Sequence, residues 1–289
     1  MIQDIEPHHL FNEFTPKVPA DEDLVFVFSG PKLLADIQED SCHFPHIREL
    51  QAADLNENLI WLFRLDETSC FLLELSQETE TAEAFCQENS GFSMHSLKEF
   101  RGCLPKEEVF AAMTAFHLYD WYRNNCFCGR CGHPTVPDTK QRMLFCPECK
   151  NMIFPKIAPA IIVGVIDGDR LLLTKYAGPG HKSYALVAGF TEIGETAEQT
   201  VMREVMEETG LKVKNIHYYK TQPWGIASDL LIGYFAELDG DASITLDQNE
   251  LAMGEWVSQK DLDLPDDDFS MTSQMIAQFA LHGRNVLEP

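Results

Sequence analysis

Three glutamates at helical spacing are the first residues in this sequence whose arrangement suggests chemistry. Glu204, Glu207 and Glu208 stand at positions i, i+3 and i+4, so their carboxylates share one face of a predicted helix. Like charges at this spacing cost about 0.2–0.5 kcal/mol per pair, and no lysine or arginine within the helix follows any of them by four residues. Mg²⁺ and Mn²⁺ prefer one or two carboxylates together with substrate phosphates. This face is a candidate metal site, and a solvated acidic surface is the plain alternative in a chain with 46 acidic residues.

The helix that carries these glutamates is predicted over residues 196–209. Thr196 and Gln199 have the spacing of a capping box at its start, and Gly210 stands where a left-handed C-terminal cap belongs. A second face of the helix, which we expect to pack into a core, consists of Val201, Met202, Val205 and Met206.

The residues around this helix resemble the Nudix box, G-x5-E-x7-R-E-U-x-E-E-x-G-U, in which U is aliphatic. The matching positions are Gly189, Glu195, Arg203, Glu204, Val205, Glu207, Glu208, Gly210 and Leu211. The resemblance implies attack of water on a phosphorus of a pyrophosphate, assisted by Mg²⁺ or Mn²⁺ on the three glutamates. Glu208 would accept the proton of the water. Arg203 would orient Glu207 by a charge-assisted hydrogen bond, and Glu195 would cap backbone donors or reach a second ion.

Four cysteines have the spacing of a metal site. Cys128-x2-Cys131 and Cys146-x2-Cys149 form two pairs separated by 14 residues. Four thiolates at this spacing suit tetrahedral Zn²⁺ and leave no open position, so the site would be structural. Four unrelated thiols are the alternative, and Cys126 is interpreted as a spare neighbour. This segment could also bind nucleic acid, but its basic residues are few: Arg130, Lys140, Arg142 and Lys150. The sequence also reveals no aromatic platform on which nucleic-acid bases would stack.

Composition and hydrophobic pattern predict an α+β chain of three parts. Residues 1–125 form a small α+β domain, 126–155 a four-cysteine zinc ribbon, and 156–289 a Nudix α/β/α sandwich with a mixed β-sheet. The expected strands are 24–28, 60–65, 70–75, 160–166, 170–176, 184–188, 217–220, 230–238 and a short one within 250–257. Further helices are expected at 106–124 and 272–282, and a glycine-proline loop at 178–180. No internal repeat is visible in the sequence.

The order of these parts, with Gln222-Pro223-Trp224 after the box, resembles the NAD(H) pyrophosphatases of the NudC type. The resemblance implies cleavage of NAD(H) to nicotinamide mononucleotide and AMP, structural zinc, a homodimer and, in some members, action on NAD-capped RNA 5′ ends. It also implies that Glu250 binds metal and that the substrate contacts are Phe154, Phe190, Gln222 and Trp224. Two features depart from the family motif: residues 225–227, Gly-Ile-Ala, replace Pro-Phe-Pro, and Thr221 replaces Ser.

Net charge and hydropathy limit where the protein is expected to act and which partners it can bind. No run of 18 apolar residues and no secretory signal is present, so we expect a cytoplasmic protein without a membrane span. A net charge of −24 argues against general nucleic-acid binding, because such proteins need a basic surface. The alternative substrates are NAD-capped RNA, ADP-ribose and dinucleoside polyphosphates. A non-catalytic nucleotide-binding module is a further alternative from a different class.

Overall fold

The computed structural model describes residues 1–50, 59–75, 79–89, 91–177, 183–264 and 268–288. The chain divides into two compact units. Unit 1 contains residue 1 and residues 157–224 and 229–289, and unit 2 contains residues 2–156 and 225–228. The loop predicted at 178–180 lies outside the described residues.

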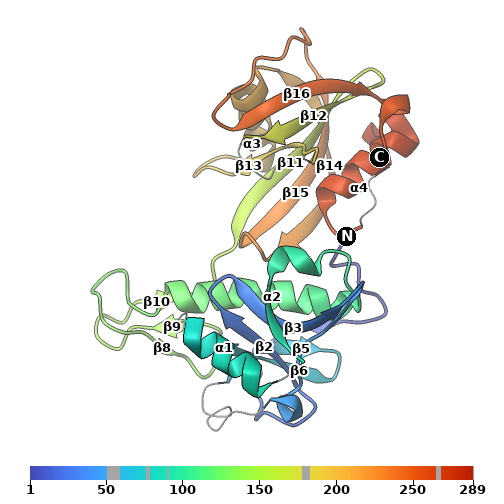
Figure 1. Cartoon of the computed structure of the whole chain (residues 1–289). Coiled ribbons are helices and arrows are strands. Elements are labelled where there is room, and N and C mark those ends of the chain that lie inside the picture. Colours follow the sequence, from blue (N-terminus) through green and yellow to red (C-terminus); the bar gives the residue numbers. More distant parts are fainter. Residues whose placement is uncertain (51–58, 76–78, 90, 178–182, 265–267, 289) are drawn as a thin grey trace. The chain divides into compact units, whose positions relative to one another are not determined.

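Unit 1 is built on a six-stranded mixed sheet of order β14-β15-β11-β12-β16, with β13 paired to β11 (Figure 1). β11 and β15 run parallel, and the other neighbouring strands run antiparallel. The strands are β11 Ala158–Asp167, β12 Arg170–Tyr176, β13 Val187–Phe190, β14 Val213–Trp224, β15 Asp229–Leu238 and β16 Leu251–Ser258. The helices are α3 Ala197–Thr209 and α4 Met271–His282, with short 3₁₀ helices at Gln259–Asp261 and Gly283–Leu287.

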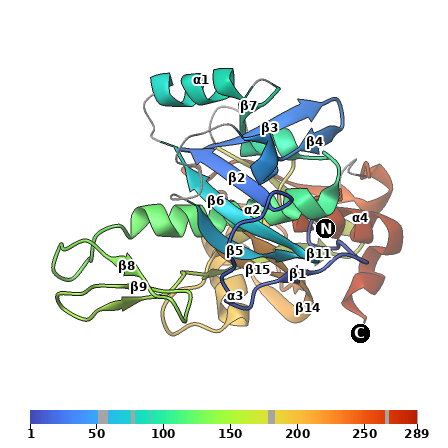
Figure 2. The same ribbon diagram turned by 90° about the horizontal axis from the view of Figure 1, so that it is seen from below.

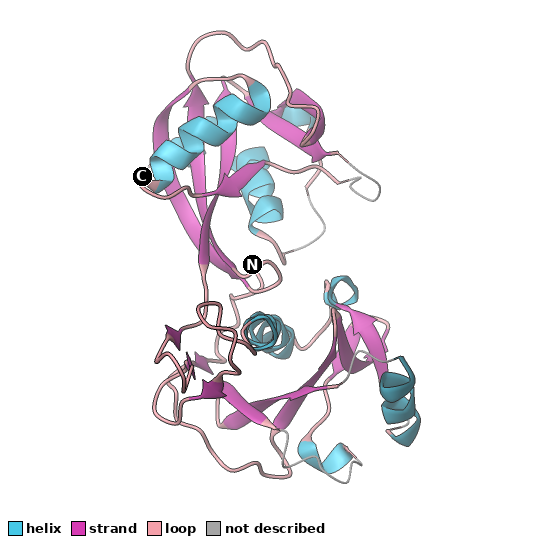
Figure 3. Cartoon of the chain, turned by 90° about the vertical axis from the view of Figure 1, so that its left-hand side faces the viewer, coloured by secondary structure: helices cyan, strands magenta, loops and turns pink. Residues whose placement is uncertain are grey.

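Side-chain alternation along β11 explains why a helix covers each face of this sheet. Ile161 and Val163 pack into a core that contains Val201 and Val205 of α3. Ile162 and Ile166 point to the other face, into a core with Met271, Met275 and Phe279 of α4. The two helices therefore lie on opposite faces of the sheet, as Figure 3 shows. This arrangement confirms the α/β/α sandwich with a mixed sheet that the sequence predicts.

One buried amide joins β14 to the start of α4. Gln222 is completely buried, its side-chain nitrogen donates to the Phe269 carbonyl at 3.0 Å, and its side-chain oxygen accepts from the Met271 backbone at 2.8 Å. The Met271 nitrogen belongs to the first turn of α4, where backbone donors have no partner within the helix. Gln222 thus satisfies a helix terminus that would otherwise be buried with an unpaired donor.

Unit 2 contains a seven-stranded sheet of order β1-β5-β6-β2-β3-β4, with β7 paired to β3 (Figure 2). The helix α2, Lys106–Asn124, packs on one face, where the rings of Tyr119 and Phe28 stack 4.7 Å apart. The strands are β1 Leu10–Phe11, β2 Leu24–Ser29, β3 Lys32–Gln38, β4 Ser41–His43, β5 Ile60–Leu65, β6 Thr68–Glu74 and β7 Ser93–Ser96. Within the described residues of this unit, the other helices are α1 Thr79–Glu88 and the 3₁₀ helices Ile47–Glu49 and Leu97–Phe100. The small α+β domain predicted here is confirmed.

Four strands of unit 2 repeat the topology of four strands of unit 1. In unit 2 the order is β5-β6-β2-β3, with β2 and β6 parallel and with antiparallel pairing in the two hairpins. In unit 1 the order β14-β15-β11-β12 has the same pairing, with β11 and β15 parallel. The chain therefore contains a structural duplication that is not visible as a sequence repeat.

The cysteine-rich segment of unit 2 forms a three-stranded antiparallel sheet of its own. Its strands are β8 Val136–Pro137, β9 Leu144–Phe145 and β10 Met152–Ile153, in the order β10-β9-β8. With strands this short, the segment has little apolar surface to bury, so its stability depends on the cysteine cluster.

Most predicted elements are confirmed, with three local corrections. The helices at 106–124 and 197–209 are present, and the latter has Thr196 as N-cap and Gly210 in the left-handed region as C-cap. Met202 and Met206, predicted to enter the core, are 45% and 39% exposed, because only Val201 and Val205 face the sheet. β13 begins at residue 187 rather than 184, and β14 begins at 213 rather than 217. Within the described residues, no helix has the length and hydropathy needed to cross a membrane.

Replacing Gln222 with leucine should destabilise unit 1. The substitution keeps the approximate side-chain volume but leaves the Met271 backbone donor and the Phe269 carbonyl without this partner. The expected loss is about 1–3 kcal/mol of unfolding free energy, measured by urea denaturation. The control is Gln248→Leu in an exposed loop, which should change stability by less than about 0.5 kcal/mol. Equal stability of the two variants would show that the Gln222 amide does not anchor α4.

Candidate active site

Arg203 organises the carboxylates of α3. Its guanidinium donates to Glu195 at 2.7 Å, to Glu204 at 2.7 Å and to Glu207 at 3.0 Å. A fourth bond, at 2.9 Å, goes to the backbone carbonyl of Phe190. These bonds hold the pKa of Glu195 down to about 2 and raise that of Arg203 further. The bond between Arg203 and Glu207 that the sequence predicts is present, and Glu195 is bound to Arg203 and to the Thr200 hydroxyl.

Gly189 makes room for the Glu204 carboxylate. A Cβ atom placed on Gly189 would stand 2.1 Å from the Glu204 carboxyl carbon, so a side chain there would displace it. Glu204 is 9% exposed, and burial raises the pKa of its carboxyl against the opposing effect of Arg203. The glycine at the start of the box is therefore required by close approach and not by a special backbone angle.

Glu208 is the carboxylate with the least compensation. It is 2% exposed, and its Oε2 atom has no hydrogen-bond partner among the described residues. Burial raises the pKa of Glu208 to about 8, with further contributions from the charges of Glu204, Glu250, Asp247 and Glu207. A buried carboxylate of this kind either holds a proton or needs a cation beside it.

Three further residues, Glu250, Tyr176 and Asp247, lie beside Glu204 and Glu208. The carboxylates of Glu204, Glu208 and Glu250 are called the acidic cluster. Of the three further residues, only Glu250 was predicted from the sequence. Glu250 precedes β16 on the strand side of the site, and its charge acts on both Glu204 and Glu208. The Tyr176 hydroxyl lies near the same carboxylates, and burial together with their charges raises its pKa to about 12. Asp247 bonds through its backbone to the Glu208 carbonyl at 3.0 Å. Carboxylate oxygens without compensating donors form a donor set that fits a hard divalent cation.

The four residues predicted to contact substrate differ in exposure and in the unit to which they belong. Phe190 is 55% exposed at the end of β13, next to the box glycine, and its carbonyl is bound by Arg203. Trp224 is half-buried at the end of β14, with its ring edge-on to Phe269 at 5.7 Å. Phe154 is 52% exposed in unit 2. Gln222 is buried with both ends of its amide bonded to backbone, which gives it a scaffold role. Its contact with substrate stays a prediction.

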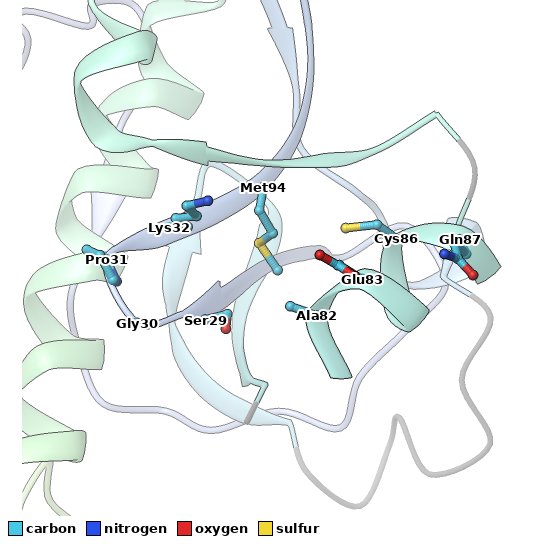
Figure 4. Close-up of a pocket in the computed structure, with 9 residues that line it drawn as sticks. All are labelled: Ser29, Gly30, Pro31, Lys32, Ala82, Glu83, Cys86, Gln87 and Met94. Carbon is cyan, nitrogen blue, oxygen red and sulfur yellow. The ribbon is translucent and has the colours of Figure 1, made fainter. Parts of the chain in front are cut away.

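Two hollows in the surface contain none of the predicted glutamate ligands. A pocket of about 540 Å³ in unit 2 lies beside the β2–β3 turn, with Lys32, Cys86 and Met94 in its lining (Figure 4). A pocket of about 680 Å³ in unit 1 is lined by Glu195, Arg203 and the exposed methionines of α3. Neither has the convergent carboxylates that the acidic cluster has, so the cluster is the candidate for chemistry.

The four predicted zinc ligands come together in unit 2. The Sγ atoms of Cys128, Cys131, Cys146 and Cys149 all lie within 4.8 Å of one another, and two of the distances are 3.5 Å. Tetrahedral zinc requires sulfur atoms about 3.8 Å apart, so the cluster fits the ion. Backbone N–H groups point at the sulfurs and hold the pKa of Cys128 down to about 6. Cys126 bonds instead to carbonyls of α2 and is not part of the cluster.

Replacing Cys146 with serine should remove zinc and unfold the small sheet. Binding of structural zinc is worth about 10–16 kcal/mol in comparable modules, which cannot fold without it. Metal analysis of the purified variant should find less than one zinc per chain, and its melting temperature should fall. Cys126→Ser is the matched control and should keep the metal. Full zinc content in the Cys146 variant would contradict the ligand assignment.

Glu208→Gln should flatten the pH dependence of stability in buffer without added divalent cation. Its folded-state pKa is raised to about 8, whereas an unfolded glutamate titrates near about 4.3. The folded state then holds a proton that the unfolded state has lost, so this stability is present at low pH and disappears as pH rises through 8. Melting temperature from pH 5 to pH 8 should therefore fall more in the parent than in the variant. Added Mg²⁺ at pH 8 should raise the melting temperature of the parent and not that of the variant. If the melting temperatures of parent and variant fell equally from pH 5 to pH 8, the raised pKa of Glu208 would be contradicted.

Known proteins resemble parts of this chain. Two proteins named NAD-capped RNA hydrolase NudC, from Citrobacter koseri and Salmonella typhi, are each 41% identical to it over 147 residues. This alignment covers 51% of this chain and 57% of each relative, so the chain spans little more than half the length of the relatives it matches. A crystal structure of a Nudix hydrolase from Nitrosomonas europaea has a TM-score of 0.47 and 20% identity, covering 54% of this chain and 90% of that one.

Three family models match the chain one after another. The first, described as an NADH pyrophosphatase-like rudimentary NUDIX domain, matches residues 22–121. The second, described as an NADH pyrophosphatase zinc ribbon domain, matches residues 123–154, and the NUDIX domain matches residues 156–279. With the complete box on α3 and the four clustered cysteines, these matches show that the chain belongs to the Nudix family and carries the accessory domains of its NADH pyrophosphatases.

Proposed function

We propose that this protein hydrolyses the pyrophosphate bond of NAD(H) and releases nicotinamide mononucleotide and AMP. The observation that carries the proposal is the acidic cluster of Glu204, Glu208 and Glu250 beside the Arg203 network. Glu204 and Glu208 are buried, and Glu250 is exposed beside them. Buried like charges disfavour the fold unless they serve a cation, and a cation held by carboxylates binds phosphate oxygens readily. The family models for an NADH pyrophosphatase zinc ribbon and Nudix-like domain support the choice of substrate.

The carboxylates of the acidic cluster are the proposed ligands of a bound Mg²⁺ or Mn²⁺. Glu204, Glu208 and Glu250 would hold it, and Glu207, which is exposed and bonded to Arg203, would be a further ligand. When bound, the ion would lower the pKa of a water molecule and neutralise phosphate charge. The pairing of Arg203 with Glu204 and Glu207 keeps these side chains in one orientation before substrate arrives.

Glu208 is proposed as the group that takes the proton from the attacking water. Its Oε2 atom is free of hydrogen bonds among the described residues and therefore has a lone pair available. The pKa of about 8 applies without a cation, and positive charge nearby lowers it, so the carboxylate form prevails at neutral pH. General base catalysis of this kind is worth about 10²–10⁴-fold in rate.

Exposed aromatic side chains are proposed to hold the bases of the dinucleotide. In unit 1 the exposed Phe190 and the half-buried Trp224 offer ring surface to a planar ligand. Phe154, which is exposed on unit 2, is a separate candidate. The departure from the family motif after Trp224 has a structural reason. Gly225, which belongs to unit 2, lies against α2, where a Cβ atom would stand 2.2 Å from the Met113 carbonyl. Proline in place of Gly225 would clash there.

The NAD cap of RNA is the second candidate substrate. It presents the same pyrophosphate, and the relatives at 41% identity are named for its hydrolysis. ADP-ribose and dinucleoside polyphosphates share the pyrophosphate chemistry and remain rivals. A non-catalytic nucleotide-binding module would have no use for a buried Glu208 whose Oε2 atom has no hydrogen-bond partner in the described part of the chain. We also propose the homodimer that the family resemblance implies, which light scattering of the purified protein would test.

Product analysis tests the proposed reaction. Purified protein incubated with NADH, NAD⁺, ADP-ribose or a diadenosine polyphosphate in Mg²⁺ or Mn²⁺ should release AMP and reduced nicotinamide mononucleotide fastest from NADH. Omitting the divalent cation should abolish release, because the carboxylates of the acidic cluster repel the substrate phosphates when no cation lies between them. Faster turnover of ADP-ribose or the polyphosphate would support pyrophosphate hydrolysis but would contradict NAD(H) as the preferred substrate. No cleavage of any substrate would overturn both.

Glu208→Gln should reduce turnover of NADH by about 10²–10⁴-fold while leaving the fold intact. The amide keeps the shape of the side chain but cannot accept the proton. Glu198→Gln, on the same helix but outside the acidic cluster, is the matched control and should keep turnover within about twofold of the parent. Steady-state kinetics with both variants measure the difference. Parental turnover in the Glu208 variant would remove this residue from the mechanism.

A further inference from the structure

Arg203 has no N–H group left for a substrate phosphate. A guanidinium carries five N–H donors. The Nε donor and one Nη2 donor of Arg203 bond to Glu195. The two Nη1 donors bond to Glu204 and Glu207, and the last Nη2 donor bonds to the Phe190 carbonyl. While these bonds persist, a hydrogen bond from the protein to a phosphate oxygen at the acidic cluster must come from another residue.

Tyr176 lies on the face of β12 that is turned to α3. Leu172 of this strand packs in the core with Val201 and Val205 of α3. Side chains two and four residues further along a strand point to the same side, so Thr174 and Tyr176 share this face. Thr174 is completely buried, whereas Tyr176, the last residue of the strand, is half-buried. In this row of side chains, Tyr176 therefore has surface open to a ligand.

Irregular strand pairing and a backbone bond hold Tyr176 and Glu250 at the same end of the sheet. The register between β12 and β16 shifts after Lys175, so that Tyr176 pairs with Leu251. An irregularity of this kind changes the direction of the side chains beside it. The Ala177 N–H then donates to the Glu250 carbonyl at 2.8 Å. The position of Tyr176 relative to this carboxylate is thus fixed by the backbone of the sheet.

The Tyr176 hydroxyl is a neutral donor beside the carboxylates. Burial raises the pKa of the phenol to about 12, and the charges of Glu208, Glu250 and Glu204 contribute to the increase. Because all three members of the acidic cluster act on it, the hydroxyl lies next to the cluster. The hydroxyl keeps its proton at neutral pH, and unlike a lysine it brings no positive charge that would compete with a cation for the carboxylates.

We propose that the Tyr176 hydroxyl donates a hydrogen bond to a non-bridging phosphate oxygen of the bound substrate. The location of the pyrophosphate at the acidic cluster rests on the proposed function. The carboxylates repel phosphate, and the O–H group adds a donor of fixed direction to the charge that a cation supplies. A donor held by a strand is also positioned more precisely than one on a loop. Because the contact involves phosphate alone, it should serve every pyrophosphate substrate, whatever base is attached.

Two other roles for Tyr176 would involve the cation instead of the phosphate. Direct binding to the cation needs the phenolate, which the raised pKa disfavours. Holding a carboxylate in place for the cation would make metal binding depend on the hydroxyl. The affinity for a cation in the absence of substrate therefore distinguishes these roles from the proposed one.

The test measures binding of α,β-methylene-ADP, whose P–C–P bridge resists hydrolysis, to the full chain in Mg²⁺ by isothermal titration calorimetry. Tyr176→Phe removes the hydroxyl and keeps the ring. It should weaken this binding by about tenfold or more, as is typical for the loss of a hydrogen bond to a charged group. With NADH, the KM of the variant should rise by a similar factor, with kcat within about threefold of the parent.

Tyr184→Phe is the matched control, because it makes the same chemical change at another site in unit 1. The Tyr184 hydroxyl donates to Glu255 at 2.6 Å, and the charges that raise its pKa are those of Glu255 and Asp263. This variant should bind the analogue within about twofold of the parent. Mn²⁺ binding without nucleotide, measured by electron paramagnetic resonance, should agree within about twofold among the parent and both variants. Melting temperatures report whether each variant is folded.

The outcomes separate this proposal from the proposed function. Loss of affinity for the analogue in Tyr176→Phe alone, with Mn²⁺ binding kept, supports the proposal whether or not the protein cleaves NADH. Unchanged affinity in Tyr176→Phe, an equal loss in Tyr184→Phe, or a parallel loss of Mn²⁺ binding would overturn it. A parent that cleaves NADH without binding the analogue would also overturn it and would leave the proposed function standing. A parent that does neither would overturn both.

Discussion

Repulsion among buried carboxylates is the constraint on which the rest of the site depends. Glu208 is almost fully buried without a hydrogen bond to Oε2 in the described part of the chain, and Glu204 and Glu250 add negative charge beside it. Such an arrangement costs free energy in the absence of a cation, which the raised pKa of Glu208 expresses. Among the carboxylates that the structure describes, Arg203 compensates Glu195, Glu204 and Glu207 and does not bond to Glu208. The uncompensated charge that remains is what a divalent ion and its substrate phosphates would relieve.

The scaffold serves this constraint through a few close contacts. Gly189 allows the Glu204 carboxylate to lie against β13, and Gly210 ends α3 in the left-handed region so that the following chain can turn back. Val201 and Val205 fix the opposite side of the helix in the core of unit 1. Unit 2 repeats four strands of this topology, and in the sequence that matches its family model the glutamate pattern of the box is absent. The duplicated fold therefore carries the glutamate pattern once.

The sequence predicts the local features of the site well, because they depend on short-range geometry. The capping box, the left-handed Gly210, the shared face of the glutamates and the knuckle cysteines all follow from spacing within one element. Contacts between distant segments are not readable in the same way. Tyr176 and Asp247 join the acidic cluster only through sheet pairing and a backbone bond to α3. The scaffold role of Gln222 likewise depends on buried bonds to Phe269 and Met271, which are distant in the sequence.

The most direct test of the central claim is to locate the divalent ion itself. Crystals of the full chain soaked in Mn²⁺ should show an anomalous diffraction peak within bonding distance of carboxylate oxygens of both Glu204 and Glu208. The account predicts that Glu208 turns its Oε2 atom to this ion and that the Arg203 bonds to Glu195 persist. An ordered Mn²⁺ ion bound elsewhere, with Glu208 still buried and unliganded at saturating metal, would contradict the claim that the acidic cluster exists to hold a cation.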